Sequence, residues 1–162
     1  MGSRRPRTLP DLLTRAGGAL ALLLVCAGVA EAHLRIVIDK DAQRMIVVVD
    51  GVKRHSWPIS TGRAEQPTPS GRFRPLTFVR REYSRLYDDA PMPYAIYFTN
   101  DGHAIHGTRA GLGAPASHGC VRLGLRNAAR LFAMTKRHGR AKTVIRIVGR
   151  DPPPAWSQGG GY

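Results

Sequence analysis

The chain has 162 residues, of which 43% are hydrophobic and 7% aromatic. This length and composition allow one ordinary domain with a hydrophobic core, and they exclude wholesale disorder. The formal net charge of +14 favours a polyanionic neighbour. The basic residues are dispersed and do not alternate with aromatic residues, which argues against a nucleic-acid partner and for affinity to an anionic cell envelope.

The first 32 residues have the features of an export signal. Four arginines precede an apolar run from Ala19 to Val29, and Ala30-Glu31-Ala32 places small residues where a signal peptidase reads them. The run is shorter than the ~20 residues that span a membrane. We therefore predict a cleaved signal peptide over 1–32, no transmembrane segment after cleavage, and a periplasmic or cell-envelope location. Cleavage would leave 21 of the 25 basic and 9 of the 11 acidic residues, a formal charge of +12.

The rest of the chain predicts a mostly-β domain over 33–150. Apolar and β-branched runs bounded by turn residues indicate strands, and Asp50-Gly51 is a strong hairpin signal between two of them. Pro67-Thr68-Pro69-Ser70-Gly71 predicts a surface loop. The predicted strands, in chain order, are 34–38, 43–49, 52–59, 72–79, 94–99 and 143–148.

One short helix is expected after residue 126. Asn127 can cap its start and Gly139 can end it. The residues that share one face at helical spacing are Ala128, Leu131, Phe132 and Thr135. The Pro/Gly-rich stretch 151–162 has little to bury and is predicted to be a disordered tail.

The cysteine count singles out Cys120. Cys26 would leave with the signal peptide, so Cys120 has no partner within the mature chain. In an oxidising compartment such a thiol is either buried and inert or kept for its reactivity. Its surroundings, Ser117-His118-Gly119-Cys120, favour reactivity, because two polar side chains would otherwise need partners in a core.

A nucleophilic thiol needs a base, since its unperturbed pKa of ~8.5 leaves it mostly protonated at neutral pH. In an extended segment His118 would point the same way as Cys120, whereas His103 and His106 would face opposite sides of a strand, so only one of those two can meet the thiol. We favour His106, because Gly107 exposes a carbonyl that can fix the imidazole tautomer.

Two further features fit acyl transfer. Gly119 leaves its own N–H and that of Cys120 uncovered, which suits an oxyanion hole. Arg122 is either a carboxylate clamp or a solvated charge.

Two other classes of function stay open: a zinc site built from His103, His106, His118 and Cys120, and a non-catalytic basic module that binds cell-wall polymers.

The sequence resembles the L,D-transpeptidase catalytic domain family of bacterial cell-wall enzymes. The specific matches are Ile105-His106-Gly107-Thr108 and Ser117-His118-Gly119-Cys120-Val121-Arg122-Leu123. Weaker matches are Ser60-Thr61-Gly62, Pro67-Thr68-Pro69-Ser70-Gly71 and Met92-Pro93-Tyr94, and all of them run in the family's order from about residue 34 to 149.

The resemblance implies a β-sandwich-like domain with a capping loop and no metal or organic cofactor. It implies Cys120 as nucleophile, His106 as general base and acid, and the Gly107 carbonyl as the group that orients His106. The Gly119 and Cys120 N–H groups would form the oxyanion hole with Tyr94 as a helper, while Ser117, His118 and Arg122 would shape the pocket.

The implied substrates are peptidoglycan tetrapeptide stems. The acyl acceptor stays open: a second stem for a 3-3 cross-link, a free D-amino acid, a lysine of an envelope lipoprotein, or water, which would make the protein an L,D-carboxypeptidase or amidase. Ten residues separate His106 from Ser117, fewer than in many members of the family. The acceptor specificity of those members therefore does not transfer.

Overall fold

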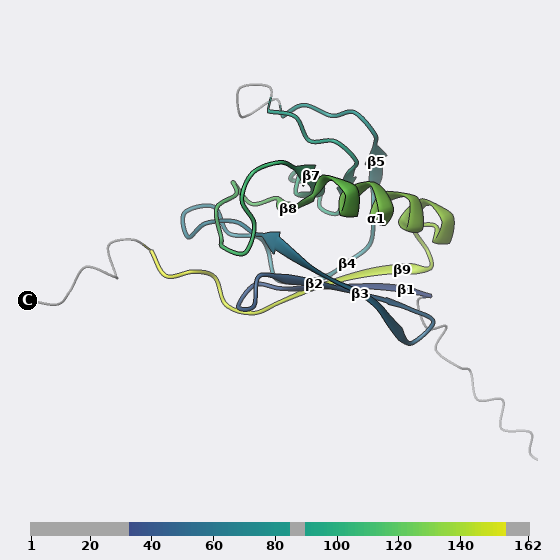
Figure 1. Cartoon of the computed structure of the whole chain (residues 1–162). Coiled ribbons are helices and arrows are strands. Elements are labelled where there is room, and N and C mark those ends of the chain that lie inside the picture. Colours follow the sequence, from purple (N-terminus) through teal and green to yellow (C-terminus); the bar gives the residue numbers. More distant parts are fainter. Residues whose placement is uncertain (1–32, 85–89, 155–162) are drawn as a thin grey trace, which may run out of the picture.

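The structure is a computed structural model that describes residues 33–84 and 90–154. The predicted signal peptide and the tail from residue 155 onward lie outside the described residues. Within these ranges the chain is mostly strand with one helix, as predicted (Figure 1). The described part of the chain contains no helix long and apolar enough to cross a membrane.

Nine strands of the described residues form one curled sheet in the order β4-β9-β1-β2-β3-β8-β7-β6-β5. The elements are β1 (Leu34–Asp39), β2 (Arg44–Val49), β3 (Val52–Ser60), β4 (Gly71–Phe73), β5 (Thr77–Val79), β6 (Ala95–Tyr97), β7 (Ala104–Thr108), β8 (Val121–Gly124), α1 (Leu125–His138) and β9 (Thr143–Val148).

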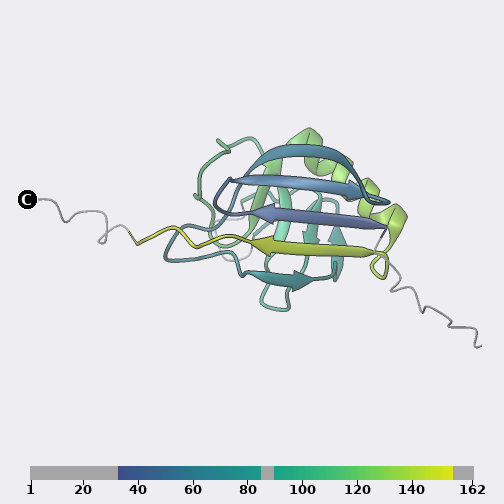
Figure 2. The same cartoon turned by 90° about the horizontal axis from the view of Figure 1, so that it is seen from below.

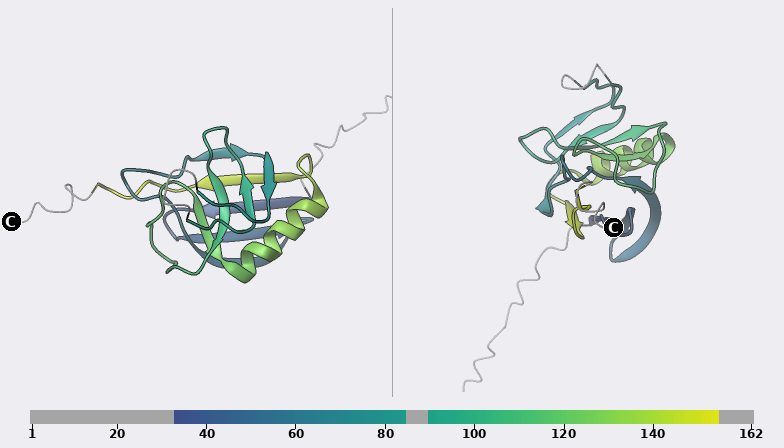
Figure 3. Two further views of the ribbon diagram at one scale, coloured as in Figure 1. Left: turned by 90° about the horizontal axis from the view of Figure 1, so that it is seen from above. Right: turned by 90° about the vertical axis from the view of Figure 1, so that its left-hand side faces the viewer.

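The sheet curls because β3 belongs to both of its halves. Most of β3 pairs with β2, whereas its last residues, Ile59 and Ser60, pair with β8. We call β4, β9, β1, β2 and β3 the broad half, which Figure 2 shows from its outer side. We call β5 to β8 with α1 the short half, and Figure 3 shows it lying over the broad half.

The broad half follows the predicted pattern closely. In β1 the alternate residues Leu34, Ile36 and Ile38 are fully buried, as a strand with one face on the core requires. The hairpin at Asp50-Gly51 is confirmed, with φ of 49° and 77° at its two residues, the left-handed values of the tight turn that suits twisted strands. The core lies between the two halves, and α1 contributes to it from the short half.

The helix is confirmed in position and face, but its start differs from the prediction. It begins at Leu125 with Gly124 at the N-cap and no side-chain cap, so Asn127 lies inside the first turn and does not cap. The four predicted core residues are the buried ones. Lys136 and Arg137 in the last turn complement the helix dipole, and Gly139 ends the helix as predicted.

One strand prediction was wrong, and one strand of the short half was not predicted. The expected strand 72–79 is interrupted: β4 pairs with β9 in the broad half, and β5 pairs with β6. Pro75 lies in the interruption and has no N–H to donate to a ladder. Strand β8 was not predicted, although Val121 and Leu123 are buried at alternate positions, because the run is only four residues long.

Candidate active site

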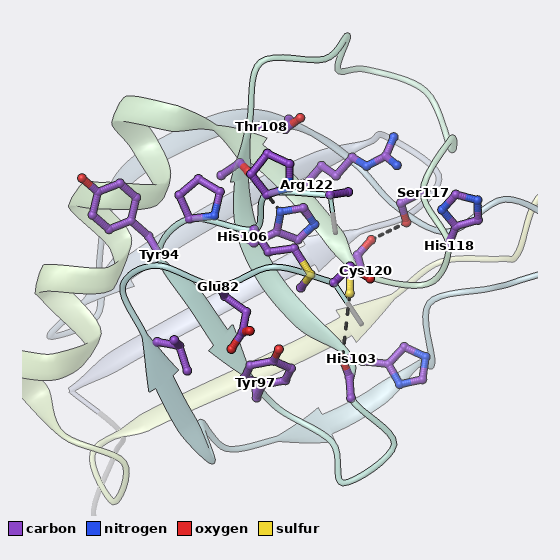
Figure 4. Close-up of a pocket in the computed structure, with 18 of the residues that line it drawn as sticks. Glu82, Tyr94, Tyr97, His103, His106, Thr108, Ser117, His118, Cys120 and Arg122 are labelled. Atoms are coloured by element: carbon purple, nitrogen blue, oxygen red, sulfur yellow. Dashed lines mark hydrogen bonds between the residues drawn. The ribbon is translucent and has the colours of Figure 1, made fainter. Parts of the chain in front are cut away.

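The predicted site residues line one pocket on the short half. Its walls come from the segments around 66–67, 76–84 and 90–94, the turn before β7, β7 itself and the motif before β8. The sequence-predicted residues that line it are Tyr94, His106, Gly107, Ser117, His118, Gly119, Cys120 and Arg122. Figure 4 shows His106 and Cys120 at its centre.

Cys120 lies immediately before β8 and is a free thiol. Its Sγ lies 3.9 Å from the carbonyl oxygen of Gly102. Burial raises the pKa of the Cys120 thiol, and this effect is opposed by the backbone N–H of Ala104 and the positive charge of Arg122. The resting thiol is therefore neutral at physiological pH, and its reaction as a nucleophile needs a base.

His106 lies on β7, which is paired with β8, and only 7% of it is exposed. Its Nδ1 donates a hydrogen bond to the carbonyl oxygen of Gly107 at 3.0 Å, the contact that the sequence predicted. In the neutral ring this leaves Nε2 as the acceptor nitrogen. Burial lowers the pKa of His106 to about 4; the Gly107 carbonyl opposes that shift and Arg122 adds to it. His106 is therefore a neutral base at physiological pH.

Gly107 brings helix α1 directly against the strand that carries His106. A Cβ at Gly107 would lie 3.0 Å from Cδ1 of Leu125 and 3.2 Å from the Pro93 carbonyl oxygen. The Gly107 N–H donates to that same carbonyl at 2.8 Å. A side chain here would force its neighbours to shift, so the position of the His106 partner carbonyl is restrained by close packing on one side and by a hydrogen bond on the other.

Ser117 ties the motif into a tight turn. Its Oγ donates to the Cys120 carbonyl oxygen at 2.5 Å and accepts from the Gly119 N–H at 3.1 Å. This corrects one prediction, because the Gly119 N–H is already bonded to Ser117 and is not free for an oxyanion. No hydrogen bond from the Cys120 N–H is found among the turn and loop bonds of the described residues.

The turn also changes the place of His118. The motif is bent at Gly119, whose φ is +104°, so the alternation of an extended strand does not apply. Figure 4 shows His118 beyond Ser117 and pointing away from Cys120. His118 is therefore at the rim of the pocket. The spacing of the two residues had predicted a position beside the thiol, and that prediction was wrong.

Tyr94 does not fit the role of an oxyanion helper. Its ring packs on Phe132 of α1, with ring centroids 5.9 Å apart, as part of the hydrophobic core. Figure 4 shows the hydroxyl far from Cys120. The backbone explains this position, because Tyr94 has the left-handed φ of +59° and its N–H bonds to the Arg80 carbonyl.

Arg122 and His103 flank the reacting pair. Arg122 is in register with His106 across β7 and β8, and its guanidinium donates to the Ala116 carbonyl at 3.2 Å. His103 also lines the pocket, because it precedes β7 and escapes the alternation of that strand. Its Nδ1 is within 2.9 Å of the Thr99 hydroxyl, so the two histidines have different partners. Within 33–84 and 90–154, no group of three His, Cys, Asp or Glu side chains is arranged to hold a metal ion.

The loop after β3 supports the motif from behind, and sequence reasoning gave its residues no role. The Thr61 carbonyl accepts from the N–H groups of Ala116 and Ser117, and Gln43 holds Thr61 through its side chain at 2.6 Å and 2.9 Å. Thr68, buried in the turn-rich stretch, bonds to Gly119. In the sequence, Thr68 is marked only by the turn-rich stretch Pro67-Thr68-Pro69-Ser70-Gly71, and this stretch does not reveal that Thr68 contacts Gly119.

The fold and the site together match one family. The family model of the L,D-transpeptidase catalytic domain (YkuD) matches residues 33–148. The chain belongs to this family. A comparison with curated protein sequences found no match.

Solved structures of the same class resemble the chain. An L,D-transpeptidase from Mycobacterium smegmatis is 27% identical with a TM-score of 0.64, over 73% of this chain and 59% of that one. An L,D-transpeptidase from Stackebrandtia nassauensis is 25% identical with a TM-score of 0.65, over 74% and 57%. The L,D-transpeptidase LdtMt1, solved in complex with imipenem, is 25% identical with a TM-score of 0.64, over 72% and 59%. The chain thus spans less than two thirds of these relatives.

Proposed function

We propose that the protein is a cysteine acyltransferase that acts on peptidoglycan tetrapeptide stems through a thioester on Cys120. The observation that carries this proposal is that Cys120 and His106 line one pocket from paired strand segments, with the His106 tautomer set by the Gly107 carbonyl (Figure 4). This is the nucleophile, base and orienting group of a catalytic triad, with a carbonyl in the third position. Membership of the L,D-transpeptidase family supports the substrate class.

In the first step the Cys120 sulfur attacks the carbonyl carbon of the third residue of the stem, and the thiol proton passes to Nε2 of His106. The tetrahedral intermediate places its oxyanion at the Cys120 N–H. The bond to the terminal D-alanine nitrogen then breaks, and His106 returns the proton to this leaving amine. Since both groups are neutral at rest, the proton transfer accompanies the attack.

In the second step an amine attacks the thioester carbonyl carbon and loses a proton to Nε2 of His106; the carbon–sulfur bond breaks, and His106 passes the proton to the departing Cys120 sulfur. Glu82 supports an amine acceptor, because its carboxylate lines the pocket and Figure 4 shows it on the wall opposite Arg122. Oε1 of Glu82 accepts from the Tyr83 N–H at 3.1 Å, which holds the side chain in place. The amine of a neighbouring stem would give a 3-3 cross-link, and a free D-amino acid or an envelope lipoprotein would use the same step.

The place of action follows from the substrate. Peptidoglycan lies outside the cytoplasmic membrane, so we propose that the export signal at 1–32 delivers the domain to the periplasm. The positive charge favours the anionic cell wall.

Mass spectrometry with imipenem tests the acyl-enzyme. The wild-type protein is expected to gain one covalent adduct, and Cys120→Ala is expected to gain none. His33→Ala, at an exposed histidine outside the pocket, is the control, and it should still form the adduct. A folded wild-type protein that gains no adduct would contradict the proposed chemistry.

Incubation with purified tetrapeptide muropeptides identifies the acceptor. Dimers linked between third residues are expected if the acceptor is a stem, and exchanged stems if it is a D-amino acid. Tripeptides alone would indicate an L,D-carboxypeptidase. Binding to cell wall without turnover, unchanged in Cys120→Ala, would indicate a non-catalytic binding module.

A further inference from the structure

Thr68 is a buried residue that reaches the motif from the loop between β3 and β4. It is 1% exposed and does not line the pocket. Its hydroxyl donates to the Gly119 carbonyl oxygen at 2.8 Å, 51 residues further along the chain, and accepts from the Gly62 N–H at 2.8 Å. The hydroxyl therefore spends its single O–H donor on the Gly119 carbonyl and accepts from Gly62, so the residue contacts the site through one carbonyl.

That carbonyl belongs to the peptide group that contains the Cys120 N–H. A trans peptide is planar, and its C=O and N–H point in opposite directions. No cis peptide occurs among the described residues. Because the Gly119 carbonyl points to the buried Thr68, the Cys120 N–H must point the other way, to the side on which Cys120 lines the pocket.

The orientation of the Gly119–Cys120 peptide has to be fixed by hydrogen bonds, because Gly119 has a φ of +104° and glycine is the residue least restricted in that region. The Gly119 N–H is held by Ser117, so the Cys120 N–H is the remaining donor of the predicted oxyanion pair. A hydrogen bond at the carbonyl end of an amide also polarises its N–H into a stronger donor.

Thr68 is itself firmly held. A Cβ at Gly62 would lie 2.1 Å from the Gln66 carbonyl oxygen and 2.7 Å from the Thr68 nitrogen, so this loop closes tightly on a residue without a side chain. On the other side, the Lys40 ammonium donates to the Thr68 carbonyl oxygen at 3.2 Å, and its side chain is 2% exposed. The backbone of Thr68 is thus held on both sides, and its hydroxyl is held by the Gly62 N–H and the Gly119 carbonyl.

We propose that Thr68 is a positioning residue for the oxyanion hole, and that it acts by orienting and polarising the Gly119–Cys120 peptide so that the Cys120 N–H faces the reacting carbonyl. The proposal rests on the proposed function, since it assigns the Cys120 N–H to the oxyanion of the thioester-forming step. It predicts a specific defect, because the thiol stays in place while the developing negative charge loses stabilisation.

The test compares two reactions of the same thiol. Acylation by imipenem develops an oxyanion, whereas alkylation by iodoacetamide does not. Thr68→Val is expected to slow acylation by about ten- to a hundredfold and to leave the alkylation rate within about twofold. Thr68→Ser, which keeps the hydroxyl, is expected to recover most of the acylation. With muropeptides, kcat should fall in Thr68→Val while KM stays close to the wild-type value.

Thr135→Val is the matched control. Thr135 is fully buried in α1, and its hydroxyl donates to the Leu131 carbonyl at 2.8 Å, away from the pocket. Thr135→Val also removes a buried threonine hydroxyl but leaves the Gly119–Cys120 peptide unchanged. The rates of acylation by imipenem and of alkylation by iodoacetamide should therefore stay at the wild-type level. A Thr68→Val protein in which acylation and alkylation fall together, or in which acylation is unchanged, overturns the proposal.

An NMR measurement separates this proposal from the proposed function. Loss of the hydrogen bond to the Gly119 carbonyl should shift the backbone amide nitrogen resonance of Cys120 upfield in Thr68→Val and not in Thr68→Ser. An unshifted resonance overturns the role of Thr68 even if the wild type is acylated. A wild type that imipenem does not acylate contradicts the proposed function, while the resonance still decides whether Thr68 orients this peptide. Should Thr68→Val fail to fold, Thr68→Ala, which also lacks the hydroxyl and adds no second thiol, replaces it in both measurements.

Discussion

The broad half and the short half of the sheet are held together in different ways. In the broad half, β1 pairs with β2 and with β9 over six residues each, through backbone ladders. In the short half, β6 and β7 share two paired positions, and the motif before β8 is tied by the side chains of Ser117 and Thr68. Regular backbone pairing therefore holds the strands of the broad half, whereas a few polar side chains set the geometry of the site, and the hydrophobic core is shared by both halves. Substitutions in the two halves should separate stability from activity.

Removal of the nucleophile should have the largest effect on activity. Cys120→Ala is expected to lower kcat/KM for muropeptides by at least about a thousandfold, because the covalent step is lost. The melting temperature should change little, since alanine removes only the sulfur, whose hydrogen bond to the Gly102 carbonyl is long at 3.9 Å. Residual turnover close to the wild-type level would show that the chemistry lies elsewhere in the pocket.

A methyl group at Gly119 should have the next largest effect. Gly119→Ala places an alanine at φ +104° and its Cβ 3.1 Å from the His103 ring. We expect the unfolding free energy to fall by about 1–3 kcal/mol and kcat to fall by about a hundredfold, because the Cys120 backbone is displaced. Urea unfolding and muropeptide turnover measure the two quantities.

Gly139→Ala is the matched control for this change. Gly139 also has a left-handed φ, +79°, but a Cβ there meets no atom within 4 Å, and the residue lies at the end of α1. It should lower the unfolding free energy and leave turnover per folded molecule unchanged. Equal losses of turnover in both variants would contradict the separation between scaffold and site.

The pH profile tests the neutral pair of Cys120 and His106. His106 accepts the thiol proton only when unprotonated, and burial lowers its pKa to about 4. Activity should therefore stay on its plateau as pH falls through 6.5, and then fall about tenfold per pH unit below 4. An acid limb near 6.5 in wild-type muropeptide turnover would show that His106 is not the base or is more exposed than in this structure.

The same shift predicts a dependence of stability on pH. The unfolded chain binds a proton at His106 near pH 6.5 and the folded chain only near 4, so the folded state is favoured above 6.5 and loses about 3 kcal/mol as pH falls to 4. Urea unfolding of Cys120→Ala with and without His106→Gln isolates this contribution. The double variant should lack it.

Glu82→Gln should have a small effect confined to the second step. Loss of the carboxylate is expected to raise KM for an amine acceptor by about two- to fivefold and to leave acylation by imipenem unchanged. Glu65→Gln removes the same charge from an exposed residue outside the pocket and should change neither. A slower acylation in Glu82→Gln would place Glu82 at the donor and not at the acceptor.

A core substitution in the broad half should have the smallest effect on activity. Ile36→Ala removes a fully buried side chain of β1 and is expected to lower the unfolding free energy by about 2–5 kcal/mol. Turnover per folded molecule should be unchanged. A fall in kcat at temperatures where the variant is fully folded would show that the broad half also sets the site geometry.

The same contrast explains what the sequence could predict. The strands of the broad half, the Asp50-Gly51 hairpin and the face of α1 carry local signals, since alternation and turn residues are read within a few neighbours. The site residues could be proposed because Ser117, His118 and Cys120 lie within four positions of one motif, and the structure places them around one pocket. The conformation of that motif could not be predicted, because the bend at Gly119 depends on hydrogen bonds to Ser117 and to Thr68, which is distant in the sequence.

The Lys40 ammonium has a practical consequence for where a recombinant domain should end. The family match stops at residue 148, yet the buried Lys40 side chain is ion-paired with Asp151, beyond that limit. A protein cut at residue 148 would remove the carboxylate partner of this ammonium, directly behind the Thr68 loop, and loss of one partner of a buried ion pair is destabilising. Expression boundaries drawn from the family match are thus expected to give a less stable domain, whereas boundaries that include Asp151 keep the carboxylate partner of Lys40.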